Sequence, residues 1–151
     1  MEERVTMSRA EGLVASVEVV RRTGMAIVAI EPNCVHLRMP LQGNVGGGGV
    51  MYAGSLFTLA EAAPGLLMLN RFDSARFAST CASVNIRFRR PARSDVSLHL
   101  TISDRQFEDL ENDAFEKGKS SAEFAAELVD QDGATVSVAD VKYVLFRLAA
   151  A

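Results

Sequence analysis

Apolar and polar residues alternate along five segments of the chain, a period that is typical of strands with one buried face. The segments are residues 34–41, 84–89, 96–103, 122–128 and 136–145. In the last segment the apolar positions change parity at Ala139-Asp140, which predicts either a β-bulge or a stretch buried on both faces. Asp132-Gly133 is a hairpin turn signal between the last two segments. The pattern therefore predicts an antiparallel sheet of four or five strands.

Residues 52–70 lack this alternation and predict a helix that is apolar on nearly every side. They follow a glycine run, Gly46 to Gly49, which no regular helix or strand favours. Such a helix is normally buried, and a sheet with one apolar face needs a cover. The simplest closed arrangement is a curved antiparallel sheet wrapped around this helix, which places the chain in the α+β class.

Three further segments are less regular. Residues 13–20 have the spacing of a short amphipathic helix that ends in a glycine cap at Thr23-Gly24. Residues 25–30 predict an edge strand or an extension of the packing, and residues 105–118 a polar surface helix or an irregular excursion. With 151 residues we expect a single domain, 1–151, with an N-terminal helical segment at 1–24 and a core at 34–147.

Glu61 is the single charged residue of the predicted central helix. A carboxylate in such a place must find a partner, become protonated or serve a function. It lies either on one wet stripe of the helix or against an arginine, or else it belongs to a site. Pro64 and Gly65 follow within one turn, and a proline there removes a backbone donor and clashes with the carbonyl of Ala60. We expect the helix to kink or loosen beside Glu61, and this irregularity favours a site.

Composition excludes several classes of function. An apolar fraction of 48% and a charged fraction of 23% are those of a soluble globular protein, and a net charge of −3 argues against nucleic-acid binding. The longest apolar stretch, residues 51–69, is interrupted by Glu61 and Pro64, so we expect no membrane span. Two cysteines and no secretory signal fit a reducing cytoplasm, with the thiols of Cys34 and Cys81 buried or inert. With only two histidines, a metal site is not expected.

Two motifs resemble a known family. Residues 52–61, Tyr-Ala-Gly-Ser-Leu-Phe-Thr-Leu-Ala-Glu, resemble the helix signature of hotdog-fold acyl-CoA thioesterases of the PaaI-like (phenylacetyl-CoA thioesterase) or YiiD C-terminal-like branch. That signature is His-Gly-Gly, several apolar residues, then Leu-Ala and an acidic residue. Residues 84–92, Val-Asn-Ile-Arg-Phe-Arg-Arg-Pro-Ala, resemble a strand pattern of the same family. The likeness covers residues 34–147 in element order and implies the hotdog fold, a curved antiparallel sheet around one long central helix.

The resemblance also implies thioester hydrolysis and assigns residues to it. Glu61 falls at the catalytic carboxylate position, as general base or nucleophile at the thioester carbonyl. Gly54 falls at the helix N-terminus, where its backbone N–H would polarise that carbonyl, since free amides at a helix start suit a developing oxyanion. Asn44 matches a loop asparagine that orients the thioester or the water. Thr58 lies one turn before Glu61 and could hydrogen-bond the water or the carboxylate.

The signature is not matched at its first two positions. Tyr52 stands where many members have histidine, and Ala53 stands at the first glycine. Neither change removes the polarising group, because any residue except proline can donate a backbone N–H. The glycine run that precedes Tyr52 lacks the patterns of P-loops and dinucleotide-binding loops, so a hinge or a close backbone approach is the favoured interpretation.

A basic cluster follows the second predicted strand. It contains Arg87, Arg89, Arg90 and Arg93. One interpretation is a solvated strand end that discourages edge pairing, and the other is an anchor for the phosphates of coenzyme A, which suit arginine forks. On the second interpretation Arg89, Arg90, Arg93 and Tyr52 are the candidate CoA-binding residues. His36 and His99 have no serine or acid at useful spacing, and we expect both to be structural.

The sequence thus predicts a cytoplasmic acyl-CoA thioesterase that takes coenzyme A only as part of its substrate and uses no other cofactor. The resemblance implies a homodimer or a dimer of dimers with sites shared between subunits. The first alternative is a non-catalytic acyl-CoA or lipid-binding module of the same fold, which shares every feature except a competent carboxylate. The second is a structural assembly domain without saturable acyl-CoA binding.

Overall fold

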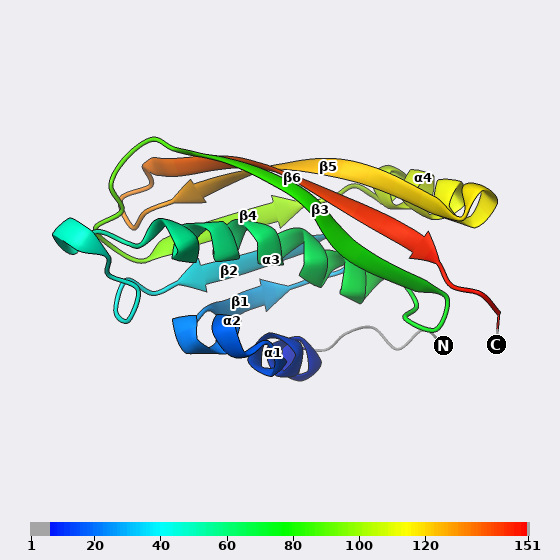
Figure 1. Cartoon of the computed structure of the whole chain (residues 1–151), viewed down its shortest axis with the longest axis horizontal. Helices are drawn as coiled ribbons and strands as arrows, with labels where there is room; N and C mark the ends of the chain where they lie inside the picture. Colours follow the sequence, from blue (N-terminus) through cyan, green and yellow to red (C-terminus); the bar gives the residue numbers. More distant parts are fainter. Residues whose placement is uncertain (1–6, 151) are drawn as a thin grey trace.

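A six-stranded sheet wraps around one long helix in the computed structural model, which describes residues 7–150 (Figure 1). The helix is α3 (Ala53–Arg71). The sheet order is β1-β2-β4-β5-β6-β3, and all neighbouring strands are antiparallel. The strands are β1 (Ala26–Ile30), β2 (Cys34–Met39), β3 (Phe77–Phe88), β4 (Val96–Thr101), β5 (Lys119–Val129) and β6 (Thr135–Arg147). This is the hotdog arrangement, so the α+β class and the fold expected from the sequence are confirmed.

The helix α3 presents one apolar face to the sheet. Leu59, Ala63 and Leu67 are fully buried and recur every four residues, the spacing of a single helix face. On another side the apolar side chains of Phe57 and Leu69 are each 42% exposed. The helix continues through Pro64 without interruption, so the disturbance expected there does not end it. Exposed apolar side chains of this kind are groups that a second molecule could cover.

Inward-facing residues of the central strands form the rest of the core. Val35, Leu37 and Met39 of β2 are buried, and the alternation predicted from the sequence is confirmed there. The strand β3 differs, because it begins at Phe77 rather than at Val84 and has few buried side chains. Its first half is rich in small polar residues and lies at the edge of the sheet, so it lacks the alternation of a strand covered on one face.

The bulge predicted in the last strand is present, but it lies earlier than expected. The pairing of β5 with β6 shifts between Leu128 and Val129, and this shift leaves Val136 without a paired residue. Val136 and Ser137 are both buried, so the inward parity changes here and not at Ala139-Asp140. An extra residue in one strand of an antiparallel pair has this effect on side-chain direction.

The structure also resolves the irregular segments. The N-terminal helix is divided into α1 (Met7–Ser16) and α2 (Glu18–Thr23), and Gly24 caps the second in a left-handed conformation, φ 74°. The first six residues of the predicted 1–24 segment lie outside the described residues. Residues 25–30 supply the edge strand β1, and the polar segment forms the helix α4 (Asp104–Lys117). Ser103 and Gln106 form a capping box at the start of α4, which explains why it is helical despite its few apolar residues.

Candidate active site

Glu61 lies half-buried on α3 and its partner is a tyrosine. The hydroxyl of Tyr143, on β6, is 2.7 Å from Glu61 Oε1 and 3.0 Å from the backbone carbonyl oxygen of the same residue. Within residues 7–150 no lysine or arginine forms an ion pair with Glu61, and no hydrogen-bond partner is found for Oε2. The alternative in which Glu61 pairs with an arginine is therefore not found among the described residues, and one carboxylate oxygen is held while the other is free.

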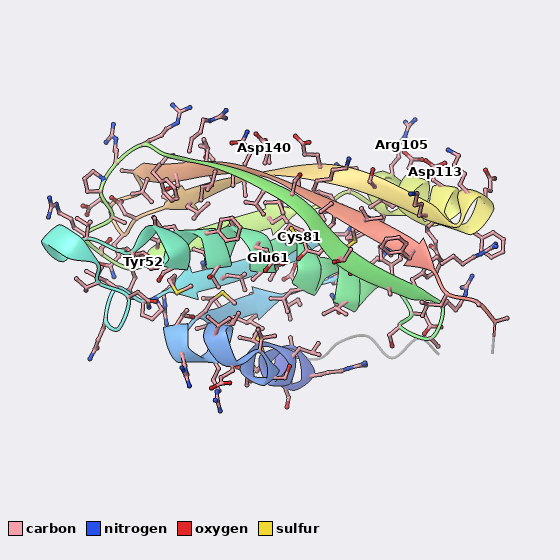
Figure 2. All side chains as sticks on the ribbon, viewed as in Figure 1. Tyr52, Glu61, Cys81, Arg105, Asp113 and Asp140 are labelled. Carbon is pink, nitrogen blue, oxygen red and sulfur yellow. The ribbon has the colours of Figure 1, made fainter. Side chains whose placement is uncertain are left out.

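Cys81 completes the surroundings of this carboxylate. It lies on β3 and is the cross-strand partner of Tyr143 (Figure 2, where Glu61 and Cys81 are labelled beside each other). Burial raises the pKa of the Cys81 thiol, and the charge of Glu61 raises it further. The same two causes, in the same order, raise the pKa of Tyr143. Both groups therefore stay protonated at neutral pH, and the Tyr143 hydroxyl is a donor to the carboxylate.

The N-terminus of α3 has an unused donor. The N–H of Ser55 bonds to the carbonyl of Tyr52 at 3.0 Å, but among the described residues the Gly54 N–H makes no hydrogen bond. A Cβ at Gly54 would lie 2.5 Å from the Tyr52 ring, so this ring lies against the start of the helix. Tyr52 is 63% exposed. The helix start thus combines a free backbone donor with an exposed aromatic ring.

Asn44 supports this helix start from inside. Its Nδ2 donates to the carbonyls of Thr23 at 2.7 Å and Pro40 at 2.8 Å, and its Oδ1 accepts from the Ser55 hydroxyl at 2.8 Å. Both amide hydrogens are therefore used inside the fold, and the geometry supports a positioning role for Asn44. The hydroxyl of Thr58 donates to the carbonyl of Gly54 at 2.8 Å. Direct contact of either side chain with water or substrate stays a prediction.

The arginine cluster divides into separate environments. The backbone N–H groups of Arg89 and Arg90 both donate to the carbonyl of the bulged Val136, at 2.8 and 3.1 Å. The bulge thereby fixes the chain as it leaves β3. A pocket of about 550 Å³ opens here, lined by Arg89, Arg90, Glu127, Ala134, Thr135 and Val138. Arg87 instead faces Asp140 at 3.9 Å, and the exposed Arg93 does not line the pocket.

These groups are well separated within one chain. Gly54 and Glu61 are seven residues apart on α3, which is about 10 Å along the helix axis. Val138, at the pocket, and Tyr143 are five residues apart on β6, or about 17 Å. One subunit therefore has a carboxylate, a helix start and a basic pocket in three places.

Sequence reasoning missed three residues around Glu61, namely Tyr143, Cys81 and Gly65. Tyr143 shares the inward parity of Val141 and Leu145, and a buried tyrosine hydroxyl usually has a partner, which is the signal that could have found it. The glycine would meet the Tyr143 hydroxyl at 2.6 Å if it had a Cβ.

The remaining candidates do not join the site. His36 and His99 are cross-strand partners on β2 and β4, and their rings stack with centroids 3.7 Å apart. Burial, then the charges of His99 and Arg38, lower the pKa of His36. In the part of the chain that the structure describes, no three side chains are grouped as metal ligands, and no helix has the length and apolarity to cross a membrane.

Comparison with known proteins assigns the family. The family described as "Domain of unknown function (DUF4442)" matches residues 10–145. The chain belongs to this family. The structure of PA5026 from Pseudomonas aeruginosa, described as a protein of unknown function and probable thioesterase, is 36% identical, with a TM-score of 0.93. The match covers 98% of this DUF4442 chain and 100% of that chain.

More distant structures share the fold of the DUF4442 chain. The thioesterase HI1161 from Haemophilus influenzae is 16% identical, with a TM-score of 0.75, over 97% of this chain and 94% of its own. The PaaI protein of E. coli, from the phenylacetic acid degradation operon, is 18% identical, with a TM-score of 0.65, over 95% and 94%. None of the curated proteins matches the chain. The resemblance to hotdog-fold thioesterases predicted from the two motifs is confirmed.

Proposed function

We propose that this DUF4442 protein is an acyl-CoA thioesterase that hydrolyses a thioester to a carboxylic acid and free coenzyme A. The observation that carries the proposal is Glu61, a half-buried carboxylate with Oε1 held by Tyr143 and Oε2 free. A carboxylate held in this way is suited to take a proton from water or to attack a carbonyl. The probable thioesterase that is 36% identical to the chain supports the same reaction class.

The reaction follows from the groups present. Glu61 removes a proton from a water molecule, whose oxygen bonds to the thioester carbonyl carbon; alternatively, the carboxylate itself attacks that carbon. The carbonyl oxygen gains negative charge, and the free N–H of Gly54 at the positive end of α3 stabilises it. The carbon–sulfur bond then breaks, and the leaving thiolate of coenzyme A takes up the proton held by Glu61. On the alternative route the thiolate leaves an acyl–Glu61 anhydride, which water hydrolyses to the carboxylic acid and free Glu61. No metal or further cofactor takes part in this scheme.

The site is proposed to be shared between two copies, as the family resemblance implies. In a homodimer or a dimer of dimers, Glu61 of one subunit would face Gly54 of the other. The unpaired outer edge of β3 and the exposed side chains of Phe57 and Leu69 on α3 are places at which a second copy could pack.

The nucleotide of coenzyme A is assigned to the basic pocket. Arg89 and Arg90 outnumber the single carboxylate of Glu127, so the pocket keeps a positive charge suited to phosphate. The flexible pantetheine arm separates the thioester from the nucleotide, so the pocket need not adjoin the carboxylate. Arg93 and the exposed ring of Tyr52 are the further candidate contacts, and a cytoplasmic location is part of the proposal.

The first test is hydrolysis of a panel of short, long and aromatic acyl-CoAs by wild type and by Glu61→Gln. Removal of a general base typically costs at least about a hundredfold, so turnover should fall by that factor in the variant. Binding of a non-hydrolysable acyl-CoA analogue should change little, because the amide of glutamine is nearly isosteric with the carboxylate. The panel also identifies the acyl group.

Two results would contradict the proposal. If wild type hydrolyses nothing in the panel yet binds the analogue, the protein is the non-catalytic acyl-CoA or lipid-binding module. If Glu61→Gln retains full turnover, the enzyme stands but the carboxylate has no part in the chemistry.

A further inference from the structure

The Tyr143 hydroxyl contacts two oxygens of one residue. It lies 2.7 Å from Oε1 of Glu61 and 3.0 Å from the backbone carbonyl oxygen of Glu61. A hydroxyl carries one proton, and a bond to a charged carboxylate is about twice as strong as a bond to a neutral acceptor. The hydroxyl therefore ties the end of the Glu61 side chain to a point beside its own backbone. This restricts the rotamers that the carboxylate can adopt.

The phenol ring is itself immobilised. Tyr143 is 5% exposed and lies on β6, between the buried Val141 and Leu145 on the same face. Its neighbour across the strand pair is Cys81. Burial and the charge of Glu61 keep the phenol protonated, as its raised pKa shows, so it stays a donor across the physiological range. A rigid donor on the sheet thus meets the one carboxylate of the helix.

Gly65 makes this approach possible. A Cβ at this position would lie 2.6 Å from the Tyr143 hydroxyl oxygen and 3.3 Å from Cζ of the same ring. Gly65 is not among the glycines with positive φ, so the backbone of α3 does not require glycine here. Glycine inside a helix costs about 1 kcal/mol relative to alanine. The space that the Tyr143 hydroxyl needs explains why glycine is present here despite that cost.

We propose that Tyr143 is a positioning residue for the reaction, which holds Oε1 of Glu61 so that Oε2 is presented to water or substrate, and that Gly65 provides the space for it. The inference rests on the proposed function, since it gives a role to the partner of the proposed general base. Tyr143 acts through Glu61 and does not itself touch the substrate.

The test measures kcat and KM of four proteins: wild type, Tyr143→Phe, Gly65→Ala and the double variant. Tyr143→Phe keeps the ring and removes only the hydroxyl, so kcat should fall about tenfold to a hundredfold while KM stays within about twofold. Gly65→Ala should lower kcat by displacing the hydroxyl. In the Tyr143→Phe background the added methyl has no hydroxyl to displace, so the double variant should be no slower than Tyr143→Phe alone.

Gly12→Ala on α1 is the matched control for the glycine substitution. Its Cβ would meet nothing within 4 Å, so kcat should stay at the wild-type value. If Tyr143→Phe does not fold, Gly65→Ala decides the question by itself: a loss of kcat absent from Gly12→Ala supports the inference, and wild-type kcat overturns it.

Different results would overturn the positioning role of Tyr143 and the proposed thioesterase activity. Normal kcat in Tyr143→Phe beside an inactive Glu61→Gln overturns the positioning role and leaves the thioesterase intact. Multiplicative losses in the double variant also overturn it, because the two residues would then act independently. No turnover by wild type overturns both.

Discussion

At the scale of single residues, Asn44 shows how the fold prepares the start of α3. Its side chain is 5% exposed and makes three hydrogen bonds, to Thr23, Pro40 and Ser55. Its backbone carbonyl also accepts from the N–H of Tyr52 at 2.7 Å. The residue therefore joins the N-terminal segment, the end of β2 and the first turn of α3. The partners of the side-chain amide are two backbone carbonyls and a buried hydroxyl. Each of them loses a hydrogen bond if the amide is removed.

We predict that Asn44→Ala lowers the free energy of unfolding by about 3 kcal/mol, since each buried hydrogen bond that is lost contributes about 1 kcal/mol. Ser55→Ala is the control, because it removes only the bond to Oδ1 and should cost about 1 kcal/mol. Urea unfolding followed by circular dichroism measures both. Equal stability of Asn44→Ala and wild type would show that this buried amide does not stabilise the helix start.

Residues differ in how far the sequence reveals their role. Glu61 could be singled out because a lone charge in an apolar helix is visible in the pattern itself. Its partner could not, since Tyr143 is 82 residues away and reads as one more apolar position of a strand. Gly65 was noticed only as a helix-weakening residue. Its close approach to the phenol depends on how α3 packs against β6, which no local pattern contains.

At the scale of elements, the bulge in β6 connects strand geometry to the proposed nucleotide pocket. The carbonyl of Val136 accepts from the backbone of both Arg89 and Arg90, which fixes the exit of β3 beside the hairpin at Asp132-Gly133. The change in apolar parity along β6 predicted that a bulge exists. Its position at Val136 could be found only from the pairing of β6 with β5. The start of β3 was missed for a related reason, because an edge strand of small polar residues has no alternation to detect.

This arrangement predicts a substrate-specific effect of Arg90→Ala. Loss of one charge-assisted contact with phosphate should raise KM for acyl-CoA about tenfold, with kcat unchanged. KM for the corresponding acyl-pantetheine, which lacks the nucleotide, should stay the same. The control is Arg105→Ala on α4, whose side chain is 89% exposed and lies outside the pocket (Figure 2). An equal rise of KM for both substrates would contradict a nucleotide contact.

At the scale of the whole molecule, the proposed site combines groups from two subunits. Two copies related by a two-fold axis would form two such sites. Each site would take the carboxylate of one subunit and the backbone donor of the other. The sequence predicts this only through the family resemblance, and the unpaired edge of β3 offers a surface on which a second copy could pack.

Mixing two inactive variants tests this shared site. Glu61→Gln removes the base, and Gly54→Pro removes the donor at a first-turn position where proline is tolerated. The new side chain would meet the Tyr52 ring, but that ring is 63% exposed and can move aside. In a heterodimer one site combines both substitutions, and the other combines the intact Glu61 of one subunit with the intact Gly54 of its partner. Random exchange should therefore restore about a quarter of the wild-type activity.

The control is each variant carried alone through the same unfolding and refolding, with thermal unfolding used to verify that both are folded. If base and donor belonged to the same subunit, every site in the mixture would lack one of them, and activity would stay at the level of the separate variants. Restored turnover in the mixture cannot arise from such a site, because neither chain supplies both groups. Inactive mixtures in which mass spectrometry detects the heterodimer would contradict the shared site and would place Glu61 and the Gly54 donor of each site in the same subunit.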